Sequence, residues 1–426
     1  MQALRGTKDI LPDEIIFWQY LYNKATEVLS LSNYSEIRTP ILESTSLFQR
    51  SIGDGTDIVN KEMYSFIDQG SRNITLRPEG TASIARSFIS NKLYQSNQTQ
   101  RLWYLGPMFR YERPQAGRQR QFHQLGIECI GSPNPMADAE VIRLAHNILK
   151  ALNCHTYKLE LNCIGDLEER NNYKAKLIEY LLPYKQDLDN DSQKRLTINP
   201  LRILDSKDQK TQTILMNAPR LTESLTTASI EHFNLVCEYL KNLNIPFNIN
   251  DQLVRGLDYY NHTAFEIKTD LLGSQDTICG GGRYDKLIKQ LGGTDTPAVG
   301  WAIGIERLML IVKNTLPINQ QKPLIYLATH GMEAQKKIWE IILILEKEQL
   351  TFELDLNNSS LQKQLKRANK SGAILCLILG NNEIEKQTIT LKWLYQGLQE
   401  TIQVANLSKE LKKIHILNHN LTIHSN

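Results

Sequence analysis

Residues 101–132, RLWYLGPMFRYERPQAGRQRQFHQLGIECIGS, constrain the fold more than any other stretch, because two strand-like runs flank a short basic loop. Side chains alternate between the two faces of a strand. Arg110 and Glu112 therefore share one face of the first run. The second run places four residues on one face: Phe122, Gln124, Gly126 and Glu128. A hairpin of these runs presents the groups that suit a nucleoside triphosphate beside a small polar substrate.

The loop between the two runs adds three cations, Arg113, Arg118 and Arg120. Charged groups that a sheet would bury need compensation, since an uncompensated buried charge is costly. The hairpin therefore predicts a binding site. Taken by itself, the segment also fits a solvated amphipathic hairpin with a flexible basic tip.

Composition excludes several classes of protein. The 426 residues are 41% hydrophobic and 22% charged, as in a globular chain of two or three domains. No apolar run reaches the length of a membrane span, and the N-terminus lacks the apolar core of a secretory signal, so we expect a cytoplasmic protein with no membrane partner. The six cysteines form no CxxC pair, which predicts reduced thiols and neither a disulfide nor a zinc site.

The first domain is expected to begin with a long amphipathic helix. Apolar residues from Ile15 to Leu29 follow helical spacing after Pro12, with Asp13 as the expected N-cap. The apolar side would pack on the chain's own core or against a second copy. From about 166 to 234 the sequence is polar, helical in period and interrupted by prolines, which predicts a helical insertion.

A short polar segment at 314–322 is expected to link two domains, 1–321 and 322–426. Beyond it, strand and helix patterns alternate. This order predicts a small α/β domain with a mostly parallel sheet.

Several of these residues resemble the signature motifs of class II aminoacyl-tRNA synthetases. Phe-Arg-Tyr-Glu at 109–112 followed by Phe122 is similar to the second motif, Gly-Ile-Glu-Arg at 304–307 to the third, and Glu-Ile-Arg-Thr-Pro at 36–40 to the end of the first. LVRGLDYY at 253–260 and GGRYD at 281–285 resemble the two histidine-specific signatures. The resemblance to the histidyl-tRNA synthetase family spans nearly the whole chain.

That resemblance implies an α+β catalytic domain built on an antiparallel sheet and carrying the helical insertion, followed by an α/β anticodon-binding domain. It implies a homodimer and the ATP-dependent attachment of L-histidine to tRNA(His) through a histidyl-adenylate. Such a reaction relies on positioning and on stabilising charge at the phosphates. Magnesium is expected with ATP, held largely by phosphates and water and without dedicated protein ligands.

The arginines and the aromatic of the two strands receive roles in this reaction. Arg110 is expected to contact the α-phosphate, with Arg255 as a second arginine there, and Arg307 to hold the γ-phosphate. Phe122 can stack on the adenine and Glu112 can accept from its amino group. A structural alternative for Arg255 is an ion pair with Asp258.

Histidine recognition is expected from residues that can read a ring and an α-ammonium. Glu128 would accept an imidazole N–H, and Gln124 would hold the surroundings or the carboxylate. Glu79 and Thr81 would accept from the α-ammonium. The full expected set is Glu79, Gly80, Thr81, Gln124, Glu128, Tyr259, Tyr260 and Tyr284.

Two segments are expected to contact tRNA. The hairpin tip offers Arg113, Gln115 and Arg118. In the second domain, basic residues recur at helical spacing: Lys363, Lys366, Arg367 and Lys370. A solvated charged helix face is the alternative there, and the resemblance favours RNA.

Two other functions compete with this one. A noncatalytic, histidyl-synthetase-like regulatory subunit of ATP phosphoribosyltransferase shares the catalytic fold but lacks the tRNA-handling parts. The chain's Arg110, Arg255, Arg307, basic tip and second domain count against that alternative. An inactive nucleic-acid-binding or scaffold protein would leave charges such as Glu128 without a purpose.

Overall fold

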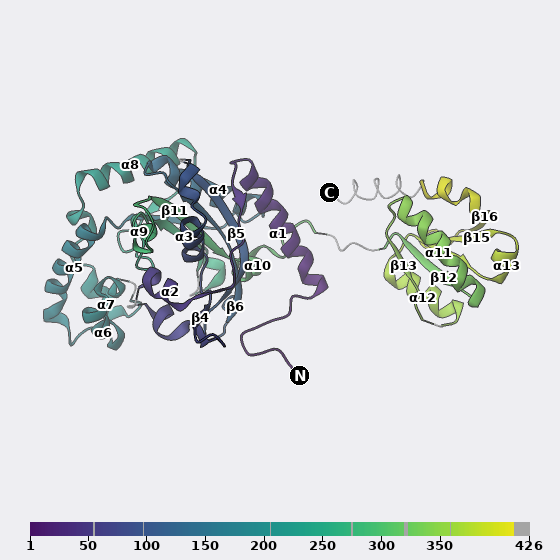
Figure 1. Cartoon of the computed structure of the whole chain (residues 1–426), viewed down its shortest axis with the longest axis horizontal. Helices are drawn as coiled ribbons and strands as arrows, with labels where there is room; N and C mark the ends of the chain where they lie inside the picture. Colours follow the sequence, from purple (N-terminus) through teal and green to yellow (C-terminus); the bar gives the residue numbers. More distant parts are fainter. Residues whose placement is uncertain are drawn as a thin grey trace. The chain divides into compact units, whose positions relative to one another are not determined.

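The computed structural model describes residues 1–53, 56–96, 98–204, 206–273, 276–318, 323–357 and 359–412. Contacts within the chain divide it into two compact units, Met1–Ile318 and Asn319–Asn426 (Figure 1). Residues 319–322 of the expected linker lie outside the described residues. The two units are considered separately below.

The described part of the first unit is built on an eight-stranded sheet in the order β1-β5-β6-β11-β10-β9-β7-β8. The β1–β5 and β7–β8 pairs are parallel, and the other neighbours are antiparallel. The expected antiparallel architecture is confirmed. The strands are β1 (Ser35–Glu36), β5 (Gln100–Phe109), β6 (Gln121–Ile130), β7 (Lys158–Cys163), β8 (Asn248–Ile249), β9 (Asn261–Lys268), β10 (Thr277–Arg283) and β11 (Ala298–Gly304).

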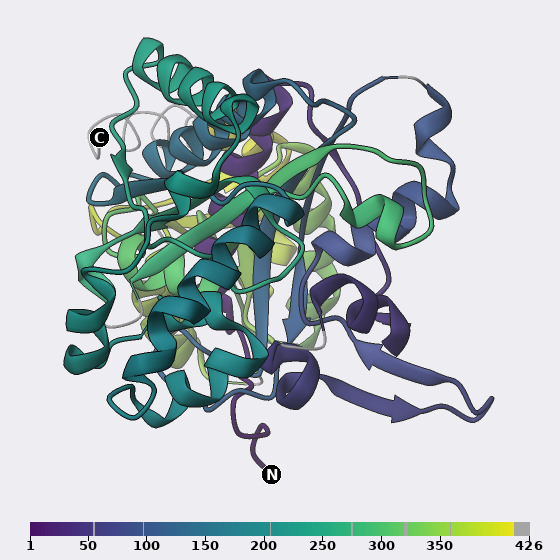
Figure 2. The same ribbon diagram turned by 90° about the vertical axis from the view of Figure 1, so that its left-hand side faces the viewer.

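A smaller antiparallel sheet has the order β2-β4-β3. Its strands project from the body of the unit, as Figure 2 shows. They are β2 (Leu42–Ser44), β3 (Tyr64–Ile67) and β4 (Asn73–Leu76). The shorter helical segments of this unit are α2 (Thr45–Ile52), η1 (Ile58–Glu62), α3 (Thr81–Ser90), η2 (Leu93–Ser96), η6 (Asp270–Leu272), α9 (Leu287–Gln290) and α10 (Ile305–Val312).

Three long helices share one apolar core with the large sheet: α1 (Pro12–Ser30), α4 (Pro135–Ala151) and α8 (Thr227–Asn242). Leu21 and Leu29 of α1 are buried in this core, so the core-facing alternative holds for that side of the helix. The expected Asp13 cap is wrong, because α1 already begins at Pro12, with Leu11 at the N-cap. Proline suits the first helical position, where its missing N–H costs nothing.

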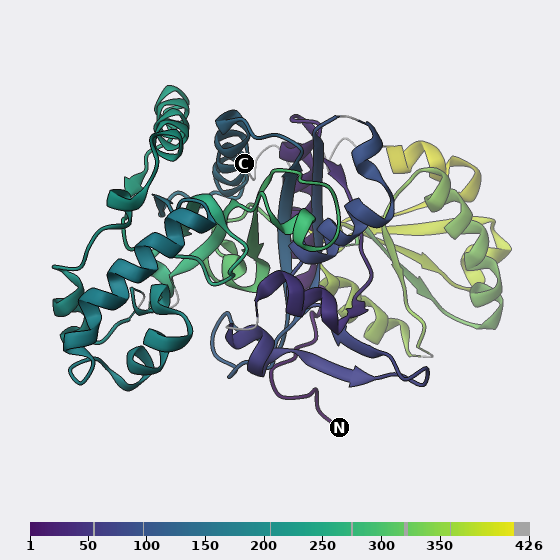
Figure 3. The ribbon, with the colours of Figure 1, turned by 60° about the vertical axis from the view of Figure 1, so that its left-hand side comes forward.

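The predicted insertion consists of short helices that gather at one end of the unit (Figure 3). They are α5 (Leu167–Leu181), η3 (Leu182–Tyr184), α6 (Asn190–Ile198), η4 (Pro200–Ile203), α7 (Gln209–Leu215) and η5 (Leu221–Ser224). Asp166 begins α5 with a capping box, in which its side chain accepts from the Glu169 N–H. The helix α8 runs past the expected boundary at 234, because Phe233 and Leu240 pack in the main core. It therefore joins the insertion to the sheet.

The second unit has a five-stranded sheet in the order β13-β12-β14-β15-β16. The pairings of β12 with β13 and β14 are parallel, whereas the pairings of β14 with β15 and of β15 with β16 are antiparallel. The prediction of a mostly parallel sheet is therefore wrong for the β15 and β16 side. A short turn at 394–398 joins β15 and β16 as a hairpin, which requires antiparallel strands. The elements are β12 (Ile325–Thr329), α11 (Met332–Lys347), β13 (Phe352–Leu354), α12 (Leu361–Ser371), β14 (Leu375–Leu379), α13 (Asn381–Glu385), β15 (Thr388–Trp393), β16 (Gln399–Gln403) and η7 (Val404–Asn406).

The two units should fold independently, because the main apolar cluster of each lies within that unit. We expect a fragment ending at Ile318 to unfold cooperatively. Its unfolding free energy should differ from that of the same unit in the full chain by less than about 1 kcal/mol, which corresponds to about 2–4 °C in Tm. Differential scanning calorimetry of the fragment and of the full chain measures this. Loss of a cooperative transition in the fragment would contradict independent folding.

Candidate active site

The strands β5 and β6 pair antiparallel, as the sequence predicts for residues 101–132. Phe122 and Gln124 lie on one face of β6, since residues two apart in a strand point the same way. One expectation fails: β5 ends at Phe109, so Arg110 and Glu112 occupy the following loop and are not strand residues. Both side chains nevertheless reach the same pocket as the β6 residues.

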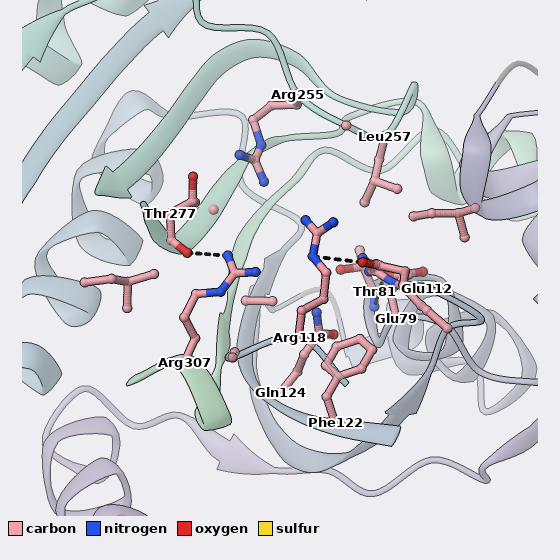
Figure 4. A pocket seen from close by; sticks show the side chains of 18 of the residues that line it. Glu79, Thr81, Glu112, Arg118, Phe122, Gln124, Arg255, Leu257, Thr277 and Arg307 are labelled. Carbon is pink, nitrogen blue, oxygen red and sulfur yellow. Dashed lines mark hydrogen bonds and ion pairs between the residues drawn. The ribbon is translucent and has the colours of Figure 1, made fainter. Parts of the chain in front are cut away.

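A cavity of about 250 Å³ opens beside this hairpin (Figure 4). Its wall comes from β6, the loops around it, the segment 255–260 and the start of α10. The expected residues on this wall are Glu79, Thr81, Arg110, Glu112, Arg118, Phe122, Gln124, Arg255, Tyr259, Tyr260 and Arg307. Three expected residues are absent from the wall of this pocket: Gly80, Glu128 and Tyr284.

Arg255 forms its ion pair with Glu266 of β9, through a short contact to Nη1. The alternative pairing with Asp258 is therefore wrong. The guanidinium lies flat above β10, where a Cβ at Gly280 would fall 2.1 Å from Nη2. Glycine at this position is thus required for the close approach. The Arg255 Nε is buried without a hydrogen-bond partner, which leaves a donor available to a ligand.

The other cations gather at the same end of the pocket. Arg307, in the first turn of α10, donates from Nη1 to the Thr277 carbonyl at 2.7 Å. Arg110 donates from Nε to the Pro78 carbonyl at 2.9 Å and stands over the Phe122 ring at 5.3 Å. Burial, and then the charges of Arg118 and Arg110, lower the pKa of Arg307. Such mutual repulsion predicts an anionic ligand here.

The hairpin tip divides into two parts. Arg118 points into the pocket, and its Nε lies 2.8 Å from Oε2 of Glu112. Arg113 and Gln115 are exposed. The three residues predicted to contact tRNA are therefore placed differently: Gln115 and Arg118 bridge each other through backbone hydrogen bonds, and this tight turn directs the Arg118 side chain inward.

The opposite end of the pocket is acidic. The carboxylate of Glu79 caps α3, accepting from the backbone N–H of Thr81 at 2.6 Å and of Ala82 at 2.8 Å. The Thr81 hydroxyl donates to Glu128 Oε1 at 2.7 Å, and the Tyr284 hydroxyl makes a short hydrogen bond to Oε2. Glu128 is only 1% exposed and lies behind the wall of the pocket.

Burial changes the ionisation of these carboxyl groups. It raises the pKa of Glu128 to about 8, although the hydrogen bonds from Tyr284 and Thr81 favour the charged form. Burial likewise raises the pKa of Glu79, against the N–H groups of Ala82 and Thr81. The two carboxyl groups thus favour a cationic or N–H-rich ligand that would compensate their charge.

Tyr104 was not expected from the sequence. Its ring packs directly against two glycines, since a Cβ at Gly80 or at Gly126 would lie 2.3 Å from ring carbons. Its hydroxyl is buried without a partner. Tyr104 pairs with Gly126 across β5 and β6. Since Gly126 was expected on the site face, the residue opposite it could have been predicted as a site residue from the sequence.

Glu306 was quoted in a motif without a role. Its carboxylate accepts from the His123 backbone N–H at 2.9 Å, and its Oε1 lies 2.9 Å from His123 Nδ1. Glu306 borders the cavity beside Arg307. This bond ties β6 to α10 and thereby fixes the start of the helix that carries Arg307.

The basic residues of the second unit lie on α12. Lys363, Lys366, Arg367 and Lys370 are all exposed. Arg367 is also bound to Asp355, with Nη1 at 2.8 Å from Oδ2. The helix therefore presents a cationic face, and Arg367 is held in place.

Comparison with known proteins covers both units. Residues 6–308 match a family model described as histidyl-tRNA synthetase, and residues 321–414 match one described as anticodon binding domain. Among the described residues, no helix is long and apolar enough to cross a membrane.

Individual relatives are similar over nearly their whole length. A protein of Gracilaria tenuistipitata var. liui, named histidine–tRNA ligase, chloroplastic, is 65% identical, with 97% of this chain and 98% of that protein aligned. A histidine–tRNA ligase of Rippkaea orientalis is 54% identical, with 97% and 96% aligned. The crystal structure of apo S. aureus histidyl-tRNA synthetase has a TM-score of 0.80 and 35% identity, covering 96% of this chain and 99% of that one.

The raised pKa of Glu128 predicts a pH dependence of stability. The folded chain keeps the proton of Glu128 up to about pH 8, whereas an unfolded glutamate loses it near 4.5. The stabilisation of the fold by the Glu128 proton is therefore complete below pH 4.5 and is lost as pH rises through 8. Glu128→Gln has no proton to lose, so its Tm should rise relative to wild type between about pH 4.5 and pH 8 and then stay level, by roughly 2–4 °C per kcal/mol. A constant Tm difference across that range would contradict the assignment.

Proposed function

The chain belongs to the histidyl-tRNA synthetase family, and we propose that the cavity beside β6 is where it joins histidine to ATP before charging tRNA(His). One observation carries the proposal. Four guanidinium groups, of Arg110, Arg118, Arg255 and Arg307, line a single pocket that Glu79 also borders, and the buried carboxyl group of Glu128 lies behind its wall. A triphosphate suits the guanidinium groups, and a cationic amino acid suits the carboxyl groups.

The first step is attack of the histidine carboxylate on the α-phosphorus, with release of pyrophosphate and formation of histidyl-adenylate. Arg110 and Arg255 are assigned to the α-phosphate oxygens, where negative charge develops. Arg307 is assigned to the γ-phosphate. Phe122 stacks on the adenine, and Glu112 accepts from its amino group. In the second step a terminal ribose hydroxyl of tRNA attacks the acyl carbon, and AMP leaves.

Histidine occupies the acidic end. Glu79 and Thr81 accept from its α-ammonium, while Gly80 lets the backbone approach, and Gln124, whose buried Oε1 has no hydrogen-bond partner, can accept a further N–H. Tyr259 and Tyr260 form flat walls, and Tyr284 packs behind them against Tyr259. Glu128 lies behind Thr81 and Tyr284 and accepts from both, so its bond to the imidazole requires these hydroxyl groups to rearrange. A site built on such bonds rejects analogues that lack them.

Magnesium is proposed to arrive with ATP. Within the described residues, no group of three His, Cys, Asp or Glu side chains could cage an ion. Glu306 borders the pocket beside Arg307 and offers the oxygen ligands that Mg²⁺ prefers. This residue fits an ion held mainly by phosphate oxygens and water, which when bound neutralises charge on the departing pyrophosphate.

Transfer RNA is proposed to contact both units. The exposed Arg113 and Gln115 are placed to meet the acceptor end. In the second unit, the cationic face of α12 with Lys363, Lys366 and Arg367 is assigned to the anticodon arm, supported by the match of 321–414 to the anticodon-binding family. Residues 1–321 would then form the catalytic domain and 322–426 the anticodon-binding domain.

A homodimer is proposed by membership of the family. It is supported by apolar residues on α1 and around the small sheet that remain exposed in the single chain, such as Ile15 and Phe66. A cytoplasmic location also stays a prediction. The aligned relatives include chloroplastic ligases as well as ligases of Rippkaea and Crocosphaera.

The regulatory-subunit alternative is not favoured. A solved ATP phosphoribosyltransferase regulatory subunit/histidyl-tRNA synthetase from Bacillus halodurans has a TM-score of 0.65 at 21% identity, which shows the shared fold alone. The relatives at 54–65% identity are named histidine–tRNA ligases. Histidine-dependent ATP–pyrophosphate exchange tests the choice, since a regulatory subunit or scaffold gives none.

Arg255→Ala should raise the activation free energy of histidyl-adenylate formation by roughly 3–4 kcal/mol, because a donor to the developing charge is lost. Pyrophosphate exchange measures this, with calorimetry to show that the variant remains folded. An exchange rate within a few-fold of wild type would remove Arg255 from the mechanism.

The divided hairpin tip predicts two different phenotypes. Replacing Arg113 and Gln115 together with alanine should spare exchange, slow transfer to tRNA and reduce the salt dependence of tRNA binding by about one counterion. Arg118→Ala should instead lower exchange, because that side chain lies in the pocket. Equal effects of the two variants on both half-reactions would show that the tip acts as one unit.

A further inference from the structure

The loop that carries Arg255 is held from the insertion side. We call residues 255–258 the arginine loop. The Gly256 carbonyl accepts from Arg202 Nη2 at 2.5 Å, and the Asp258 carbonyl accepts from Arg170 Nη1 at 3.4 Å. Arg202 belongs to η4 and Arg170 to α5, so both donors are residues of the insertion.

A third contact of the insertion fixes the same loop. Asn199, just before η4, donates from Nδ2 to Asp258 Oδ1 at 3.2 Å. On the other side, the Asp258 N–H donates to the Ile52 carbonyl of α2 at 3.3 Å. The arginine loop therefore lies between the insertion and α2, with hydrogen bonds on both sides.

The two ends of Arg255 are thus held by different parts of the unit. Its guanidinium is paired with Glu266 and rests on Gly280, whereas the next peptide but one along the chain, between Gly256 and Leu257, is held by Arg202. A hydrogen bond from a charged donor is worth about twice a neutral one. A shift of about 1 Å at a group that meets the transition state can cost about 100-fold in rate.

The geometry points to Arg202 as a positioning residue for adenylate formation, acting through the Gly256 carbonyl on Arg255. This inference rests on the proposed function, because it requires Arg255 to act in that reaction. It makes the insertion a part of the adenylation site: a displacement of η4 moves the arginine loop. The chemical step and whatever the insertion binds are coupled through this hydrogen bond.

The test is a double-mutant cycle on the full chain, assayed by pyrophosphate exchange. Arg202→Ala should lower the kcat of exchange about 10- to 100-fold, with a smaller change in the KM for histidine, and Arg202→Lys should restore part of it. Arg220→Ala is the matched control, since Arg220 is an exposed insertion arginine 3.6 Å from Asp251, which precedes the arginine loop. The control should stay within about twofold of wild type.

The cycle separates positioning from a general loss of structure. In the Arg255→Ala background, Arg202→Ala should add less than about a twofold further fall, because its target is already absent. The same fall in both backgrounds, or an equal fall for Arg220→Ala, would overturn the inference while leaving the role of Arg255 intact. If Arg255→Ala itself has no effect, or wild type shows no histidine-dependent exchange, the proposed function fails first. Calorimetry of each variant shows whether the fold is kept.

Discussion

The pocket and the carboxyl group behind it depend on the absence of Cβ atoms from two neighbouring strands, β10 and β11. A Cβ at Gly280 would fall 2.1 Å from Arg255, and one at Gly300 would fall 2.0 Å from the Glu128 carboxylate. Gly280 lies on β10 and Gly300 on β11, which are neighbours in the antiparallel sheet, so the missing side chains leave space at the level of the backbone. Long polar side chains fill that space lying flat. The sheet can then bury a guanidinium and a carboxyl group without opening its hydrogen-bond ladder.

Charge of opposite sign is kept apart around this pocket. At one end, burial and neighbouring cations lower the pKa of Arg307, and at the other, burial raises the pKa of Glu128. The charges are only partly compensated within the chain, by Glu112 beside Arg118 and by Arg110 near Glu79. A ligand with an anionic and a cationic end compensates both charges further. Binding free energy is thereby available for alignment of the reacting groups.

The sequence predicted the parts of this site that depend on strand alternation and on motif residues. Phe122 and Gln124 face the pocket because a strand has a period of two. The partner of Arg255 could not be predicted, since Arg255 lies in a loop over Gly280 and Glu266 is the residue that pairs with Gly280 on the neighbouring strand. The buried position of Tyr104 likewise follows from tertiary packing, which a local sequence pattern does not report.

The helix α8 has a consequence for how this architecture can be rearranged. Because its Phe233, Val236 and Leu240 belong to the main core, the polar segment before it is not a removable cassette with two free ends. An exchange of insertions between relatives would have to cut between η5 and α8 and preserve the capping box at Asp166. The insertion can diversify only within these fixed junctions, so variation in its length is confined to the short helices and turns between them.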